Sequence, residues 1–323
     1  MKTKQEAPDT NITKVTDTNV SDESIILEAA TCQSSALKLI VEALKDALKD
    51  INIKWIKPTP DVADSGGMSI VAYNPKTAVL IKIKIPASSF DKFYINPPGG
   101  ANEIQIGINM KAFNLIMKMG RNNDGTTLIL NEHDRNELTF IFENGESNVR
   151  SRYNVKLLEL PDEGIHLPTT QFPFKIIILS DDFHKIIRDS QNISNKISIK
   201  FINTKEIKNT IVFSSKGDFA DGESILTDAV DGVQIIKNMD DDEEIIVKGT
   251  YDLKNLSLFS KCQTLCGCVE LYLKNNFPLI IKYKVANLGH ALLVLSTSST
   301  DNPLEDDDSE SDDEKNENNE NKV

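Results

Sequence analysis

The segment that decides the fold is Phe277-Pro278-Leu279-Ile280-Ile281-Lys282-Tyr283-Lys284-Val285-Ala286-Asn287-Leu288-Gly289-His290. It follows a helix-like segment over residues 251–261 and closes the folded part of the sequence. Before it, the chain repeats a pattern of one amphipathic helix followed by several strand-like runs. The periodicity predicts helices over residues 35–50, 110–119, 181–191 and 251–261, at intervals of roughly 70 residues. This spacing indicates four copies of one supersecondary unit.

Between the predicted helices, alternating or β-branched runs are typical of strands. Examples are residues 79–85, 138–142 and 196–201. Residues 161–168 contain two prolines and a glycine midway along the chain, which suits an extended connector between two domains. We therefore expect more sheet than helix, in two similar halves.

The composition is that of a globular protein of 323 residues, long enough for two domains with their own apolar cores. No apolar run approaches membrane-spanning length, and the first residues lack the apolar core of a secretory signal. We therefore expect a soluble, intracellular protein. The spacing of Cys262, Cys266 and Cys268 lacks the paired two-residue gaps of structural zinc sites, so together with Cys32 they are expected to be reduced thiols and no metal is predicted.

The net charge of −13 would argue against nucleic-acid binding if it were spread evenly. Much of the excess, however, lies in residues 304–323, which contain almost no apolar side chain and are predicted to form an acidic disordered tail. Residues 1–23, rich in Thr, Asn, Asp and Lys, are predicted to be a disordered N-terminal extension. Neither end is expected to belong to the fold.

The predicted helices each carry cations at spacings that return side chains to nearly the same face. These cations are Lys38, Lys45 and Lys49; Lys111 and Lys118; Lys185 and Arg188; and Lys254 and Lys261. For a single helix, the simpler interpretation is an ordinary solvated face, and acidic neighbours such as Glu42 and Asp189 support it. All four helices share the feature in an acidic chain, however, which favours a common channel that attracts phosphates while carboxylates cover the outside.

Five blocks of sequence, in order, resemble the proliferating cell nuclear antigen (PCNA) family of DNA sliding clamps. They are residues 35–46, 107–110, 153–160, 183–189 and 277–290. The resemblance implies an α+β DNA clamp fold with two similar domains, each with two helices packed on antiparallel sheets. It also implies a ring of three subunits with helices inside and a continuous sheet outside. The expected domains are residues 24–152 and 171–303, joined by a connector over residues 153–170.

On the family pattern, the cations at DNA-facing helix positions are Lys38, Lys45, Lys118, Lys185, Arg188, Lys254 and Lys261. Leu39 stands where many members have a second lysine, which weakens the lining slightly. The resemblance implies non-sequence-specific contacts to double-stranded DNA, without base readout. The implied function is that of a DNA polymerase processivity factor that tethers replication and repair proteins.

The resemblance also implies a hydrophobic pocket on the ring face, where partners insert a short helical turn bearing an aliphatic and two aromatic side chains. The matching positions are Tyr73, Ala78, Leu80, Pro278 and Val294, with Ile165, Leu167 and Pro168 of the connector forming one wall. Val294 replaces a common aromatic of the family. Without the resemblance, the same residues would be interpreted as strand-end core. The implied partners are a replicative polymerase, a clamp loader and proteins with short clamp-binding motifs.

Three rival functions remain open at the level of sequence. An enzyme would need catalytic groups, and Asp181-Asp182, Asp241-Asp242 and the histidines 133, 166, 184 and 290 are available. The chain has no phosphate-binding glycine loop, metal-ligand histidine pair or nucleophile elbow, so neither catalysis nor a cofactor is predicted. Asp181 and Asp182 are better explained as first-turn residues after a Ser180 cap. The remaining two rivals keep the clamp fold, with the chain acting either as a monomer or dimer or as a subunit of a heterotrimer.

The sequence also bears on the source and site of action. Abundant Asn, Ile and Lys, together with the two tails, are typical of an AT-rich source such as a large DNA virus or a protist. The corresponding locations are a nucleus or a cytoplasmic viral replication compartment.

Overall fold

The computed structural model describes residues 25–162, 164–165, 170–229, 232–238 and 244–298. The predicted N-terminal extension and acidic tail lie outside these ranges, as do Leu167 and Pro168 of the predicted connector. No helix in the described ranges is long and apolar enough to cross a membrane.

The chain consists of many short strands and a few helices. The first half contains β1 (Ile25–Thr31), α1 (Ser34–Ala47), β2 (Asp50–Ile56), β3 (Gly67–Asn74), β4 (Val79–Ile85), η2 (Ala87–Ser89), β5 (Lys92–Ile95), η3 (Pro98–Gly100), β6 (Glu103–Asn109), α2 (Met110–Met119), β7 (Gly125–Asn131), β8 (Glu137–Asn144) and β9 (Val149–Lys156). The second half contains β10 (Phe174–Leu179), α3 (Ser180–Gln191), β11 (Lys196–Asn203), β12 (Thr210–Lys216), β13 (Asp221–Thr227), β14 (Gln234–Lys237), β15 (Ile245–Asp252), α4 (Leu253–Leu256), η4 (Ser260–Leu265), β16 (Cys268–Tyr272), β17 (Leu279–Val285) and β18 (Gly289–Leu295).

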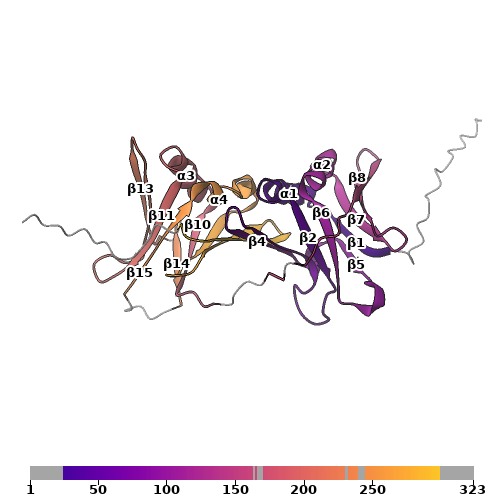
Figure 1. Ribbon diagram of the computed structural model, residues 1–323, viewed down its shortest axis with the longest axis horizontal. Coiled ribbons are helices and arrows are strands. Elements are labelled where there is room, and N and C mark those ends of the chain that lie inside the picture. The colour runs from indigo at the N-terminus through magenta and orange to yellow at the C-terminus, as the bar shows by residue number, and fades with distance from the viewer. Residues whose placement is uncertain (1–24, 163, 166–169, 230–231, 239–243, 299–323) are drawn as a thin grey trace, which may run out of the picture.

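Among the described residues, the strands form three antiparallel sheets. One sheet has the order β5-β1-β7-β8-β9 and another the order β13-β12-β11-β15. The central sheet, β14-β10-β16-β17-β18-β4-β3-β2-β6, contains strands of both halves, because β18 pairs with β4. Figure 1 shows the resulting elongated molecule, with α1 to α4 along one long side and the sheets beneath them. This is the predicted α+β clamp fold of two similar domains.

The junction of the two halves follows from strand alternation. In β4 and β18, every second side chain is buried, and Ile81 pairs with Leu293 while Ile83 pairs with Ala291. The alternate residues of both strands point to the outer face, because successive strand side chains project to opposite sides. The helices cover the inner face: Leu37, Ile40, Val41 and Leu44 of α1 are at most 1% exposed.

Two of the predicted helices are shorter than expected. The helix predicted over residues 35–50 ends at Ala47, since Leu48 is extended, with φ of −130°, and its N–H returns to the Leu44 carbonyl. The helix predicted over residues 251–261 is only the single turn α4, followed by the 3₁₀ segment η4. Its buried residues Leu253, Leu256, Phe259 and Cys262 recur every three positions, a period that suits 3₁₀ geometry better than an α-helix.

Two smaller expectations also differ from the structure. Ser180 is the first residue of α3 and not its cap; the N-cap position is Leu179, and no side chain caps the helix. The predicted start of the connector at residue 153 falls inside β9, where Tyr153 still pairs with Phe140 of β8. The strand continues to Lys156 because its ladder with β8 extends to Glu137.

Candidate functional site

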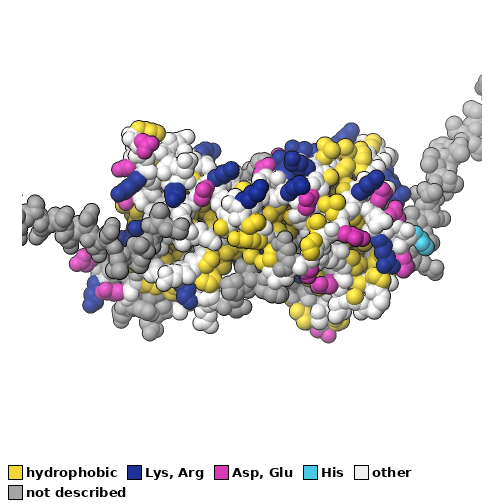
Figure 2. All heavy atoms as spheres, in the orientation of Figure 1, with side chains coloured by type: hydrophobic (Ala, Val, Ile, Leu, Met, Phe, Trp, Pro, Cys, Tyr) yellow, Lys and Arg dark blue, Asp and Glu magenta, His cyan; other side chains and the backbone are white. Residues whose placement is uncertain are grey.

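The helices bring most of the predicted cations to one long side of the molecule. Figure 2 shows Lys and Arg side chains along this side, over the positions of α1 to α4 in Figure 1, with acidic side chains among them. Lys49 is an exception, because it lies in the bend after α1 and pairs with Asp50 at 3.5 Å. The side chain of Lys261 is outside the described part of the chain.

The cations of α1 and α2 are largely engaged within the molecule. Lys45 Nζ lies 3.1 Å from a carboxylate oxygen of Asp46, and Lys118 Nζ lies 3.4 Å from one of Glu42. Lys38 Nζ donates a hydrogen bond to the Gly120 carbonyl at 3.1 Å. This last contact, like the Lys118–Glu42 pair, links α1 to the second helix of the same half.

The cations of the second half are freer. Lys185 and Arg188 on α3 are exposed, as is Lys254 on α4. None of the three forms an ion pair with another residue in the described ranges. Lys111, at the start of α2, is exposed as well, and the Asn109 side chain caps that helix by accepting the backbone N–H groups of Lys111 and Ala112. The structure thus separates the predicted cations into engaged and available ones.

The five predicted pocket residues of the two halves do lie together. Tyr73, Ala78, Leu80, Pro278 and Val294 line one pocket of about 180 Å³ on the outer face, where β4 meets β18. Phe277, Ile280 and Ser296 complete its lining and were not predicted. Strand register could have identified Ile280, because it lies directly opposite Val294, which in turn lies opposite Leu80.

The connector residue Ile165 lines a neighbouring cavity of about 490 Å³ and not the pocket itself. Tyr73 lines both hollows, so the two adjoin at this side chain. Leu167 and Pro168, which were also predicted to form the wall, are not described.

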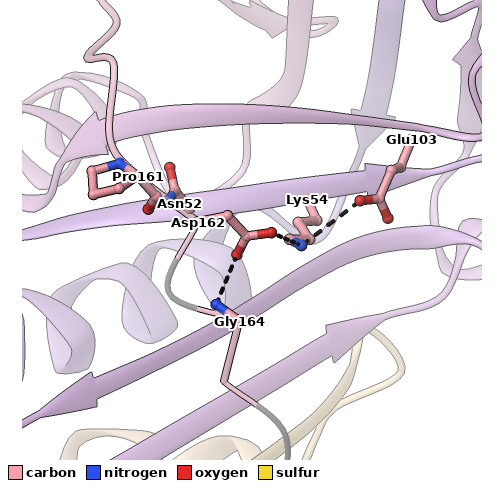
Figure 3. A network of polar contacts seen from close by, with 6 residues as sticks. All are labelled: Asn52, Lys54, Glu103, Pro161, Asp162 and Gly164. Carbon is pink, nitrogen blue, oxygen red and sulfur yellow. Dashed lines mark hydrogen bonds and ion pairs between the residues drawn. The ribbon is translucent and has the colours of Figure 1, made fainter.

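Polar contacts hold the start of the connector against β2 (Figure 3). Lys54 Nζ lies 2.7 Å from Asp162 and 3.7 Å from Glu103, and Asn52 Nδ2 donates to the Pro161 carbonyl at 2.8 Å. The hydrogen bond from Lys54 to Asp162 raises the pKa of the lysine. The chain therefore approaches the cavity along a defined path.

Two edge strands form the opposite ends of the molecule. β9 is the edge of its sheet beyond β8, and β13 is the edge of its sheet beyond β12. Figure 1 shows β13 at one end of the long axis and β8 at the other. The exposed side chains of β9 include Arg150, Arg152 and Lys156, whereas those of β13 include Asp221 and Glu223.

The residues considered for catalysis are not gathered into a reactive site. His184 is only 3% exposed and stacks on Tyr283 with ring centroids 6.0 Å apart. Asp181 accepts a hydrogen bond from Gln263 at 2.6 Å, and Asp241 and Asp242 lie outside the described residues. No group of three or more His, Cys, Asp or Glu side chains in the described ranges is arranged to hold a metal ion. Cys262 and Cys266 are buried and Cys32 and Cys268 exposed, all as free thiols.

Comparison with known proteins gives two family matches and several relatives. The model described as "Proliferating cell nuclear antigen, N-terminal domain" matches residues 26–164, and that described as "Proliferating cell nuclear antigen, C-terminal domain" matches residues 166–298. A probable DNA polymerase sliding clamp of Acanthamoeba polyphaga mimivirus is 28% identical over 312 residues, covering 87% of this chain but 64% of the viral protein. The chain therefore spans less than two thirds of that relative.

Two further relatives are matched over nearly their whole length. A probable DNA polymerase sliding clamp of Paramecium bursaria Chlorella virus 1 is 24% identical over 277 residues, which cover 86% of this chain and 98% of the viral protein. The proliferating cell nuclear antigen of Chaetomium thermophilum is 26% identical over 271 residues, which cover 84% of this chain and 97% of the fungal protein.

Proposed function

The chain belongs to the proliferating cell nuclear antigen family of DNA polymerase sliding clamps, and we propose that three copies close into a ring that encircles duplex DNA. The observation that carries the proposal is the pair of edge strands at opposite ends of the molecule, one basic and one acidic.

An edge strand presents unpaired backbone N–H and C=O groups and is a template for pairing with another chain. If β9 of one copy pairs with β13 of the next, Arg150, Arg152 and Lys156 face a strand that carries Asp221 and Glu223. Because the two surfaces differ, the contact is head to tail, and such contacts generate a ring when the rotation closes. The opposite charges favour β9–β13 contacts over contacts between two identical edges.

Closure of the ring would turn α1 to α4 of each copy toward a central channel. The available cations Lys111, Lys185, Arg188 and Lys254 would then attract the phosphate backbone. In the described ranges, the helices pack over the sheets, and none protrudes as a recognition helix that enters a DNA groove would. Contacts of this kind are sequence-independent and sensitive to salt.

The pocket at the junction of β4 and β18 is proposed to receive a short helical turn of a partner. Its lining is mostly apolar, with Tyr73 at 43% exposure on its rim, which suits an aliphatic or aromatic anchor. The partners we propose are a replicative DNA polymerase, a clamp loader and proteins with short clamp-binding motifs. Members of the family act as non-catalytic processivity factors, and we propose that this chain likewise tethers enzymes without catalysing a reaction.

Assembly onto circular DNA would require an ATP-driven loader that opens the ring. The proposed site of action is the nucleus, or a cytoplasmic replication compartment if the source is viral.

Light scattering of the full chain at micromolar concentration tests the ring. We expect three times the 36.0 kDa chain mass. Arg152→Glu alone or Glu223→Arg alone should shift the mass toward one chain, because each places like charges across every interface. The double variant restores opposite charges and should recover the trimer.

A mass of one or two chains for the unmodified protein, independent of concentration, would refute the ring and favour a clamp-fold factor acting as a monomer or dimer, or a heterotrimer subunit. Failure of the double variant to recover the trimer would refute the β9–β13 pairing specifically.

A further inference from the structure

The outer face of the central sheet carries a group of cations that the ring does not use. Lys82 of β4 lies opposite Leu292 of β18, which lies opposite Lys282 of β17. Two residues further along, Lys84, His290 and Lys284 form the next row across the same strands. These five basic residues are called the outer cationic rows.

The outer cationic rows are poorly neutralised by the described residues. Glu270 of β16 is opposite Lys282 and pairs with it at 3.4 Å, while Lys84 Nζ donates to the Gly66 carbonyl. Lys82 and Lys284 form no ion pair with any residue in the described ranges. Neighbouring strands are about 4.8 Å apart, so Lys82 and Lys282 originate only about 10 Å from each other.

Mutual repulsion within the rows adds to burial in lowering the pKa of two of their members. Burial lowers the pKa of His290, and the charges of Lys282, Lys82 and Lys84 lower it further. The pKa of Lys84 is lowered by burial and by Lys82. A bound anion would relieve this repulsion.

The chain itself contains a strongly acidic segment that could supply the anion. Residues 299–323 include eleven Asp and Glu and two Lys, a net charge of −9 out of −13 for the whole protein. Five of these carboxylates occur within residues 305–310, as Glu305, Asp306, Asp307, Asp308 and Glu310.

The point where the described chain ends places this segment within reach. β18 ends at Leu295, directly after the pocket residue Val294. Beyond the strand, the Ser298 N–H donates to the Thr250 carbonyl at 2.8 Å. The cationic rows lie two and four residues back from Val294 along β18, and the four residues from Val294 to Ser298 span at most about 14 Å, so the rows are at most about 21 and 27 Å from Ser298. The seven residues from Ser298 to Glu305 can extend up to about 25 Å.

We propose that the acidic segment 305–314 of this chain binds the outer cationic rows. The interaction is an electrostatic contact between carboxylates and Lys82, Lys84, Lys282 and Lys284, and it is independent of ring formation and of the partner pocket.

Zero-length carbodiimide cross-linking of the full chain tests the contact, because it joins only amines and carboxylates that touch. After proteolysis and mass spectrometry, we expect the carboxylates of residues 305–314 to be linked to lysines of the cationic rows. Between about 0.1 M and about 1 M salt the screening length falls from about 10 to about 3 Å, so the yield should fall about tenfold.

A variant pair separates docking from random collision. Lys82→Gln with Lys284→Gln should reduce cross-linking at the unmodified Lys282, since the segment is no longer held there. Lys200→Gln with Lys248→Gln removes another pair of facing lysines, on β11 and β15 near Thr250, and should leave the yield at Lys282 unchanged. The proposal is overturned if the segment forms no cross-links, if its cross-links fall mainly on Lys200, Lys248 or the helix cations, or if the Lys82 and Lys284 variant does not reduce the yield at Lys282.

Discussion

The separation of the helix cations into engaged and available ones leads to a sharp prediction about DNA binding. Replacing Lys185 and Arg188 of α3 by Gln removes two exposed charges that pair with no other described residue. The matched control is Glu42→Gln with Lys118→Gln, which removes an ion pair of 3.4 Å on the same side of the molecule without changing the net charge. Gln is a good helix former, so both variants should keep their helices.

The magnitude follows from counterion release. The logarithm of the binding constant falls linearly with the logarithm of salt concentration, with a slope of about −0.9 for each phosphate neutralised. Loss of one phosphate contact in the whole ring should make this slope shallower by about 0.9. Loss of all contacts made by the two residues in three subunits should make it shallower by about 5. The control variant should change the slope by less than about 0.9, because the charge of the channel is unaltered.

Fluorescence anisotropy of a labelled short duplex, titrated at several salt concentrations, measures the slope. Light scattering of both variants establishes that assembly is intact. The reasoning is refuted if the α3 variant keeps the salt dependence of the unmodified protein. It is also refuted if the slope of the control variant becomes as shallow as that of the α3 variant.

Two further predictions concern stability and the connector. Burial, helped by the charge of Arg188, lowers the pKa of His184 from 6.5 to about 4, so the folded state favours the neutral ring. The contribution of His184 to the free energy of unfolding should therefore be fully present above pH 6.5. It should fall as the pH drops toward 4, by about 3 kcal/mol at most. Urea unfolding at several pH values should show this loss in the unmodified protein and not in His184→Gln, and an equal loss in both would contradict it. In Gly107→Ala, the added Cβ would overlap the Leu158 carbonyl oxygen, so the strand-like bridge between these residues should open. Hydrogen exchange should then accelerate at the Leu158 amide, which donates to the Gly107 carbonyl at 2.8 Å, and an unchanged rate would show that the backbone adjusts without releasing the connector.

Local sequence patterns predicted most of the individual elements. The alternating run 79–85 is β4 with the same bounds, and the helix predicted over residues 110–119 is α2. The fourth helix was overpredicted, because Tyr251 to Lys261 has apolar residues at helical spacing, whereas packing buries every third residue instead. Tertiary contacts therefore overrode local propensity at that segment.

The pocket was predicted only through the family resemblance. Its lining comes from β3 and β4 in the first half and from residues 277–296 in the second, and it exists because β18 pairs with β4. Composition and periodicity assign these residues to strands but not to neighbouring strands. The register of β17 against β18, within the second half, explains why Ile280 joins the pocket although it was not among the predicted residues, because it sets Ile280 opposite Val294.

The amino-acid sequence by itself determined the alternation of helices and strands, the repeated unit and the cations on the helices, because these depend on side-chain order along the chain. Only the tertiary structure decided which cations remain available. Glu42 lies 76 residues from Lys118 and Gly120 lies 82 residues from Lys38, yet both contacts engage a predicted DNA-facing lysine. Charge compensation depends on distance in space, which falls to hydrogen-bonding range only when the two helices of one half pack side by side.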